Sequence, residues 1–403
     1  MRPLRLLDLL PAFAFLASAN IVQVAAAFLA NLVLARLLIP EQFGRFALVL
    51  AGAQLVLSIL SLRINVLIIR TPDAEDTPER RSLYFSVMTL ETGAATLLAL
   101  GYFLAIERVG AIEALLVVSI GLSHWLNHNK AFFERRMVYK GLAMIEAGCA
   151  IGAHGAAVAL AIAGFGERSL FLREILTVVL QGGGLLLIGG LTFLPLRLPS
   201  RRDVALILGQ SGGVWLDSML EALFQRLGIL IAGGLLGERG AGLLFLAQRL
   251  AMVPHQLLTP MVTRLAPNWF GRLEVETSRA AGRRTLLKVI AVPLVVAAVM
   301  TILLAGPMIH LVLGERWLPA APAFAAMAGM VACLSLFEVM RGYCLSAART
   351  RVLLAARCAQ FAGYALPLVP ILFGGSVDLQ ALGLALSAAY LCAFATGEFM
   401  LRR

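Results

Sequence analysis

Long runs without charged residues recur along this chain of 403 residues. No charged side chain occurs between Asp8 and Arg36, and similar apolar runs follow one another to the C-terminus. A bilayer-spanning helix needs about 20 mostly apolar residues, and only helices or closed barrels satisfy every backbone polar group in lipid. A composition of 60% hydrophobic and 14% charged residues also excludes a soluble enzyme or a disordered chain. The runs therefore predict an all-α integral membrane protein.

We predict about twelve spans, an even number that places both termini on one side of the membrane. The seventh is the least regular, because residues 203–236 are too many for one straight crossing at about 1.5 Å per residue. Gly209, Gly212 and Gly213 offer a place for a break or bend. The predicted spans cover about residues 12–36, 46–69, 83–106, 112–129, 142–164, 172–195, 210–235, 241–263, 288–313, 320–346, 353–373 and 379–400.

The net charge of +11 reflects topology more than a polyanionic partner. With the N-terminus inside, 23 of the 34 Lys and Arg fall in cytoplasmic segments, Arg283 and Arg357 among them. Seven, including Arg173, fall in the opposite loops, and four lie within spans. Cytoplasmic loops of membrane proteins carry such an excess of basic residues. We therefore expect cytoplasmic N- and C-termini and no nucleic-acid partner.

The chain contains a weak internal repeat. The segment that ends at Gly44, after the first span, has an echo that ends at Gly242, after the seventh. Six predicted spans precede residue 203 and six follow it, so we predict two bundles, residues 1–203 and 204–403. Duplicated six-helix halves are typical of secondary transporters that rock around a central site.

Four stretches resemble the bacterial polysaccharide, or O-antigen type, oligosaccharide flippases of the polysaccharide transporter family in the MOP superfamily. They are ARLLIPEQFG at 35–44, ERRM at 134–137, LLG at 235–237 and LGERWLPAAP at 313–322. Two places depart from the family pattern: residues 62–65, where a glycine is common, and residues 224–226, where an acid is frequent.

The resemblance implies the MATE-like MOP fold, with two six-helix bundles around a central, often cationic cavity. The implied activity is alternating-access flipping of an undecaprenyl-pyrophosphate-linked oligosaccharide from the cytoplasmic to the periplasmic leaflet of the bacterial inner membrane. Its partners would be the lipid-linked oligosaccharide, membrane lipids and other polysaccharide-assembly membrane proteins. We expect a monomer.

Arginines inside the predicted spans are the candidate substrate ligands, because a buried charge in a bilayer requires a partner, water or ligand. Arg226 lies 11 residues before Gly237 and Arg249 lies 9 residues after Gly240, so a hairpin would place both about 15 Å from the turn. Arginine matches a diphosphate with planar bidentate donors. We hypothesise that Arg226 and Arg249, joined by Arg63 and Arg341, bind the pyrophosphate. Internal ion pairs with Asp217, Glu221 or Glu338 are the alternative for these arginines.

Other polar residues inside the spans are candidates for cavity lining or ion coupling. Asp217 and Glu221 lie four residues apart on one helical face, and by the same depth count Glu221 and His255 share a level. Asn20, Gln23 and Asn31 follow helical spacing in the first span, which suits a sugar-lined cavity or hydrogen bonds between helices equally.

No catalytic motif, cofactor motif or metal site is evident, and the five histidines are scattered. The five cysteines lie in apolar segments and are expected to be small core residues. The four tryptophans lie near predicted interfaces or the bend, where an aromatic belt is the simpler explanation. We therefore expect a transporter that is not an enzyme. The alternatives are a multidrug and toxin extrusion type antiporter, which usually carries an acid in its early spans, and a membrane-embedded glycosyltransferase or polymerase, which would carry a catalytic loop. An assembly scaffold is a third, non-catalytic alternative.

Overall fold

The structure is a computed structural model that describes residues 6–106, 110–135, 139–259, 262, 270, 276–347, 349–373 and 375–402. Regular structure in these residues is helical throughout, which confirms the predicted all-α class. The helices are α1 (Leu6–Leu37), α2 (Pro40–Leu60), α3 (Ile64–Arg70), η1 (Asp73–Glu75), α4 (Pro78–Ile106), α5 (Ala111–Glu134), α6 (Tyr139–Ile162), α7 (Arg168–Leu187), α8 (Arg201–Ala251), α9 (Val253–Thr259), α11 (Glu276–Leu303), α12 (Ala305–Val312), η3 (Glu315–Ala320), α13 (Ala321–Ala326), α14 (Ala328–Ser346), α15 (Thr350–Ala365), η4 (Leu366–Phe373) and α16 (Leu379–Arg402).

Ten of the described helical segments are long and apolar enough to cross a membrane. One of them, Trp215–Ala251, has 37 residues and is divided at Gly237, where φ is 69°; the part before Gly237 lies in the predicted seventh span and the part after it begins the predicted eighth. The predicted fourth span corresponds to α5, which is not among these ten segments and whose second half carries His124, Asn127 and His128. With α5, the helices account for the twelve predicted spans.

The chain packs as two compact units. The N-terminal unit comprises Met1–Leu34 and Val49–Arg226, and the C-terminal unit comprises Ala35–Leu48 and Leu227–Arg403. The boundary at residues 203 and 204 between two six-helix bundles stays a prediction.

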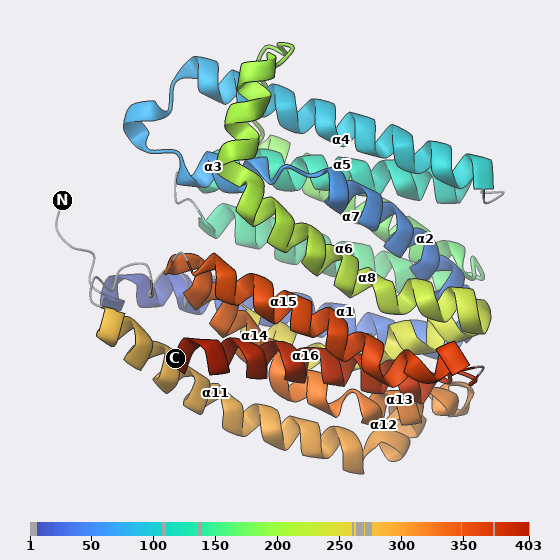
Figure 1. The fold of residues 1–403 in the computed structure, drawn as a ribbon. Helices are drawn as coiled ribbons and strands as arrows, with labels where there is room; N and C mark the ends of the chain where they lie inside the picture. The colour runs from blue at the N-terminus through green and yellow to red at the C-terminus, as the bar shows by residue number, and fades with distance from the viewer. Residues whose placement is uncertain are drawn as a thin grey trace. The chain divides into compact units, whose positions relative to one another are not determined.

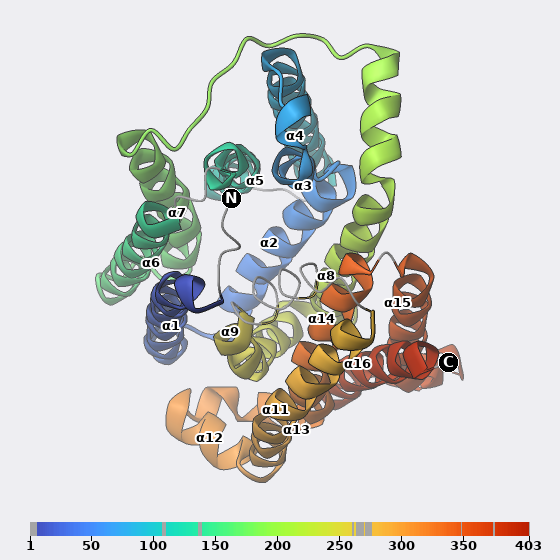
Figure 2. The same ribbon diagram turned by 90° about the vertical axis from the view of Figure 1, so that its left-hand side faces the viewer.

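In the N-terminal unit, α4 lies beside α5, and α7 packs against both α5 and α6 (Figure 1). A core of apolar side chains from α3, α4 and α5, with Ile207 of α8, holds this unit together. Figure 2 shows the extended segment that follows α7 and leads to the start of α8. Asn129 fixes this segment: its side-chain amide donates to Thr192 O and accepts from Thr192 N, both at 2.8 Å.

In the C-terminal unit, α16 packs against α13, α14 and α15, and α14 packs against α11 (Figure 1). Two of the family-like stretches meet here. The Trp317 indole is fully buried, donates to Ala35 O at 2.7 Å and stands edge-on to Phe43 at 5.3 Å between ring centroids. Arg36 donates to the Val312 and Leu311 carbonyl oxygens at the end of α12. The loose sequence pattern therefore marks one packed junction, although Arg136 and Met137 of the ERRM stretch lie outside the described residues.

The predicted second span, 46–69, is two helices. It breaks between Leu60 and Ile64, and Arg63 in the break has φ 57° and ψ 40°, the left-handed region that favours glycine. This is the position where the sequence departs from the family pattern. The helix is interrupted at Ser61–Arg63, and Arg63 is the single charged residue of the predicted span.

Other boundaries also differ from the prediction. The prediction of a break in the seventh span at Gly209, Gly212 or Gly213 is wrong, because α8 keeps helical backbone angles until Gly237. The sixth span ends at Leu187 and not at residue 195, because Gly189 adopts φ 64° and the chain then runs extended. A glycine costs a helix interior only about 0.8–1.0 kcal/mol relative to alanine, so glycine content alone does not locate a break.

Three arginines assigned to loops lie in helices instead and are 2% exposed: Arg173 in α7, Arg283 in α11 and Arg357 in α15. Each has a partner. Arg173 pairs with Glu174, Arg283 with Glu398 and Arg357 with Gln360. The count of loop charges therefore included buried residues, and the orientation of the termini stays a prediction.

The tryptophans and cysteines divide differently from the prediction. Trp317 is a core residue, so an aromatic belt does not explain it. Trp125 and Trp215 are half-buried, with indoles that donate to Thr89 Oγ1 and Ile59 O, and their place at an interface stays a prediction. Trp269 lies outside the described residues. Cys149, Cys333 and Cys344 are buried as expected, whereas Cys358 is exposed and Cys392 is half-buried.

Candidate functional site: a polar cavity in the N-terminal unit

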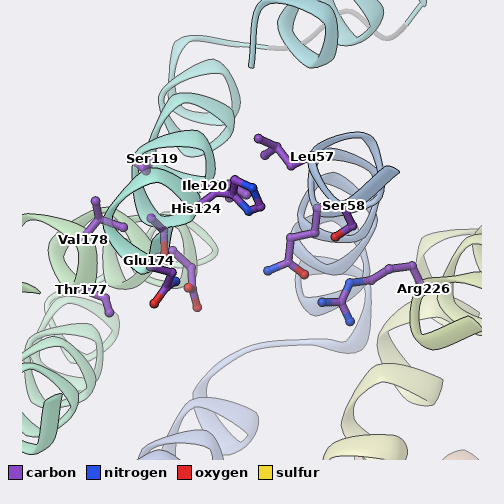
Figure 3. A pocket seen from close by; sticks show the side chains of 12 residues that line it. Leu57, Ser58, Ser119, Ile120, His124, Glu174, Thr177, Val178 and Arg226 are labelled. Atoms are coloured by element: carbon purple, nitrogen blue, oxygen red, sulfur yellow. The ribbon is translucent and has the colours of Figure 1, made fainter. Parts of the chain in front are cut away.

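A polar cavity of about 200 Å³ lies within the N-terminal unit (Figure 3). Four helices contribute to its wall, and most lining side chains carry a hydroxyl, an amide or a charge. They are Gln54, Leu57 and Ser58 of α2, Ser119, Ile120, Ser123, His124 and Asn127 of α5, Glu174, Thr177 and Val178 of α7, and Arg226 of α8. The spacing of Ser119, Ser123 and Asn127 places them on one face of α5. The cavity is suited to a ligand with several hydrogen-bonding groups.

Arg226 is the predicted substrate ligand that the structure places in this cavity. In Figure 3 its guanidinium points towards the cavity from the side opposite Glu174. Its Nη1 donates weakly to Gln225 Oε1 at 3.4 Å, and its Nε is buried with no hydrogen-bond partner among the described residues. Unmet donors of a buried guanidinium are costly, so Arg226 retains capacity for an acceptor from outside the protein.

Glu174 on the other side of the cavity is already paired. Arg173 Nη2 and Nε donate to Glu174 Oε1 at 2.7 and 3.2 Å, and Arg173 Nη1 donates to Asn31 Oδ1 at 3.2 Å. Asn31 is therefore a hydrogen-bonding partner between helices, the second of the two alternatives for that amide. Because Arg173 neutralises Glu174, the acid opposes the charge of Arg226 only in part.

The acids predicted on α8 lie close to Arg226 in the chain. Glu221 Oε1 accepts from Gln225 Nε2 at 3.3 Å, so Glu221, Gln225 and Arg226 form a short network. Asp217, one turn earlier, is buried with 6% exposure. The internal ion-pair alternative therefore retains some support at Arg226, and ion coupling by Asp217 and Glu221 stays a prediction.

Arg63 lies at the α2–α3 break and not in the cavity wall. The break exposes backbone groups that a continuous helix would satisfy, and Glu91 Oε2 of α4 accepts from Leu62 N at 3.0 Å. Asn20 and Gln23 of α1 are half-buried, and their role stays a prediction.

The remaining predicted residues belong to the C-terminal unit. Arg341 Nη1 pairs with Glu338 Oε2 at 3.2 Å, which is the internal ion pair that we set against phosphate binding. Arg249 stands over the Phe245 ring, 4.7 Å from its centroid, and His255 Nδ1 lies 2.9 Å from Ser335 Oγ. Because Arg226 and Arg249 fall in different units, their pairing across the hairpin stays a prediction, as does the shared level of Glu221 and His255.

Sequence reasoning missed much of the cavity wall. Ser119, Ser123 and Asn127 of α5 and Gln54 and Ser58 of α2 escape notice because single polar residues are common in spans. The signal for α5 was nevertheless present, as polar residues recur at positions four apart in residues 119–128. Glu174 and Arg173 were missed because Arg173 was counted as a loop residue.

A second cavity, of about 830 Å³, lies in the C-terminal unit between α11, α14 and α16. Its wall is mainly apolar, and its charged lining residues are Arg284, Lys288, Glu398 and Arg402.

Comparisons with known proteins agree with this architecture. Residues 33–322 match the family model described as polysaccharide biosynthesis protein. None of the curated proteins matches the sequence.

Three solved structures with similar folds are the lipid II flippase MurJ in an inward closed conformation, an inward-facing multidrug resistance MATE family transporter of the MOP superfamily, and the Vibrio cholerae MATE transporter VcmN. Their identities to this chain are 12%, 13% and 15%, with TM-scores of 0.73, 0.68 and 0.65. The alignments cover 96%, 95% and 98% of this chain and 87%, 98% and 96% of the other chains, in the same order. At these identities the likeness shows the fold, and the predicted MATE-like MOP fold is confirmed.

Proposed function

Because the chain belongs to the polysaccharide biosynthesis protein family and has the fold of MOP superfamily transporters, we propose that this multi-pass membrane transporter flips a lipid-linked oligosaccharide. Its substrate is an undecaprenyl-pyrophosphate-linked repeat unit, which it moves by alternating access from the cytoplasmic to the periplasmic leaflet of the bacterial inner membrane. Both termini are cytoplasmic, the chain acts as a monomer, and other polysaccharide-assembly membrane proteins are its partners. The role is transport without catalysis.

The observation that carries the proposal is Arg226 in the polar cavity. Its Nε is buried with no hydrogen-bond partner among the described residues, so a diphosphate oxygen arriving there supplies the missing acceptor. A charge-assisted hydrogen bond contributes about 1.5–3 kcal/mol, roughly 10- to 100-fold in affinity.

The other cavity residues suit the groups that adjoin a diphosphate. Ser58, Ser119 and Ser123 donate and accept through hydroxyls, and Gln54 and Asn127 do so through amides. These groups match sugar hydroxyls and phosphate oxygens equally. A volume of about 200 Å³ accommodates the diphosphate and the first part of a sugar, so the rest of the glycan lies outside this cavity.

The test is complementation of a strain that lacks the gene. The deletion accumulates undecaprenyl-linked repeat units on the cytoplasmic face, and the wild-type gene restores their delivery to the periplasm. Arg226→Ala reduces delivery roughly 10- to 100-fold, and Arg226→Lys retains part of it because the charge remains. Arg239→Ala, which removes an exposed arginine paired with Glu41, is the matched control and leaves delivery unchanged.

Normal delivery in the deletion strain would refute the proposed substrate. Loss of resistance to cationic drugs in that strain, with normal delivery, would instead favour the antiporter. Full delivery by Arg226→Ala would refute the assigned role of Arg226 while leaving the substrate in place.

A further inference from the structure

Three side chains with metal-binding atoms meet beside the α2–α3 break in the N-terminal unit. Glu91 of α4 and His124 and His128 of α5 each offer one ligand atom, and these atoms lie within 4.8 Å of one another. His124 and His128 are four residues apart, so they share one face of α5, and their ring centroids are 4.3 Å apart. Although the histidines are scattered in the sequence as a whole, these two form an H-x-x-x-H pair, the spacing by which one helix presents two imidazoles to a zinc ion.

Hydrogen bonding fixes which ring nitrogen of His128 faces Glu91. Nδ1 lies 2.9 Å from the His124 carbonyl oxygen, which only accepts, so Nδ1 carries the hydrogen. In the neutral ring Nε2 then has the lone pair, and it lies 3.8 Å from Glu91 Oε1. A histidine that donates through one nitrogen to a backbone carbonyl and presents the other to an ion is a common arrangement at metal sites.

Glu91 also has one oxygen to spare. Oε2 accepts from Leu62 N at 3.0 Å, whereas Oε1 is buried with no hydrogen-bond partner among the described residues. Glu91 Oε1 and His128 Nε2 therefore face each other in a buried place, where the Ser61 hydroxyl, 3.3 Å from Nε2, donates to that nitrogen. The unsatisfied acceptor here is Glu91 Oε1, and a metal ion shared with Nε2 in place of the Ser61 hydrogen bond would satisfy it.

From this geometry we propose that Glu91, His124 and His128 form a binding site for a divalent transition-metal ion of the zinc type. Two imidazoles and one carboxylate are a set that zinc accepts, leaving the fourth tetrahedral position open. Zinc–ligand distances of about 2.0–2.2 Å place tetrahedral ligand atoms roughly 3.4 Å apart, so small rotations of these side chains close the site. His124 also lines the polar cavity, which places the site at its wall (Figure 3).

Arg63 follows Leu62, whose N donates to Glu91, so its positive charge lies beside the trio and opposes a cation there. Its positive charge offsets that of Glu91, so the ion would leave this wall of the cavity positive and ready to accept an anionic or water ligand at its open position. The site does not depend on which substrate is transported.

The test uses the full-length protein in detergent, purified with a tag that contains no histidine, and titrated with Co²⁺ as a spectroscopic probe of the zinc site. Wild type binds one equivalent with visible d–d absorption. Glu91→Gln, His124→Gln and His128→Gln each weaken this binding at least about 10-fold, as even the loss of outer-shell partners does. Glu91→Gln keeps a carbonyl oxygen for Leu62 N, so the helix break stays satisfied.

The matched control is His310→Gln, which removes an exposed histidine 3.7 Å from Glu315. This variant still binds one equivalent of Co²⁺. Arg63→Gly, which suits the left-handed backbone, tightens binding because it removes the opposing charge. Zinc K-edge X-ray absorption of the wild-type protein needs no variant and shows scattering from two imidazoles.

The proposal is overturned if the wild-type protein shows no saturable binding of one Co²⁺ per chain. It is also overturned if that binding persists unchanged in the Glu91→Gln, His124→Gln and His128→Gln variants. Three further results would overturn it: loss of Co²⁺ binding in His310→Gln but in none of the other variants, an unchanged Co²⁺ affinity in Arg63→Gly, or a zinc absorption spectrum without imidazole scattering.

Discussion

Gly44 and Gly242 contact each other backbone to backbone in the C-terminal unit. A Cβ on Gly44 would lie 3.0 Å from Gly242 N and overlap Glu238 O, and a Cβ on Gly242 would lie 2.8 Å from Gly44 N and overlap Pro40 O. Because each glycine lacks a side chain, a backbone carbonyl oxygen of the neighbouring helix can pack directly against it: Glu238 O against Gly44 and Pro40 O against Gly242. The internal repeat aligned these two positions, so its two ends meet in space.

Alanine at either glycine destabilises the protein. The added methyl overlaps backbone that cannot rotate away, so Gly44→Ala and Gly242→Ala each cost about 1–3 kcal/mol and lower the melting temperature in detergent. Gly234→Ala is the matched control, since a Cβ there meets no atom within 4 Å. That variant melts at or above the wild-type temperature, because alanine is the better helix former. Equal melting of all three variants would contradict the close contact.

The Arg63→Gly variant is more stable than the Arg63→Ala variant. Both substitutions remove the guanidinium, but only glycine adopts φ 57° without strain, a difference of about 1–2 kcal/mol. Thermal melting of Arg63→Gly and Arg63→Ala measures that difference directly. A higher melting temperature for the alanine variant would rule out a left-handed residue at this break.

The Arg283–Glu398 ion pair matters far more to stability than the Arg239–Glu41 pair. Arg283 is 2% exposed, pairs with Glu398 and stands over the Tyr343 ring at 5.1 Å, so Glu398→Ala leaves a buried charge at a cost of about 3–5 kcal/mol. Arg239 and Glu41 are 62% and 39% exposed, and Glu41→Ala costs at most about 1 kcal/mol. The melting temperatures of the two glutamate variants provide the comparison, and similar losses in both would contradict the burial of Arg283.

The connection between α3 and α4 loosens in acid. Hydrogen bonds from Arg81, at 2.8 and 2.6 Å, together with the charge of Arg135, hold the pKa of Asp76 below its ordinary value of 3.8. A carboxyl with a lowered pKa adds stability above pH 3.8 and loses it as the pH falls below that value through the folded-state pKa. Because Asp76 is partly exposed, the effect is local and small.

Proteolysis of the wild-type connection over the acid range checks this expectation. Cleavage increases as Asp76 becomes protonated, whereas Asp76→Asn is cleaved at a rate that varies little over the same range. An identical pH response in both proteins would exclude Asp76 as the cause.

The sequence could predict the spans because lipid imposes one requirement on every crossing, a length of apolar helix. It could not predict the break at Ser61–Arg63, since one serine and one arginine do not by themselves end a helix. The interruption depends on Glu91, 29 residues later, accepting from Leu62 N. The same limit explains Trp317. Its burial depends on Ala35 and Phe43, which are distant in sequence and close only in the fold.

The site was predictable in part. Arg226 could be found because a charge in an apolar run is conspicuous, and the structure places it in the cavity. Glu91 was equally conspicuous, but its meeting with His124 and His128 depends on how α4 packs against α5, which no spacing within one helix reveals. Arg173 was counted with the outside loops because it stands at the edge of the predicted sixth span, whereas α7 already begins at Arg168.

The most direct measurement of the central claim is flipping by the purified protein in proteoliposomes. A fluorescent undecaprenyl-pyrophosphate-linked oligosaccharide is placed in both leaflets, and the fraction open to a membrane-impermeant glycosidase is followed with time. Wild type exposes the inner-leaflet pool, Arg226→Ala does so roughly 10- to 100-fold more slowly, and Arg239→Ala matches wild type. An inner pool that stays protected with the wild-type protein, at the rate of empty liposomes, would contradict the proposed function.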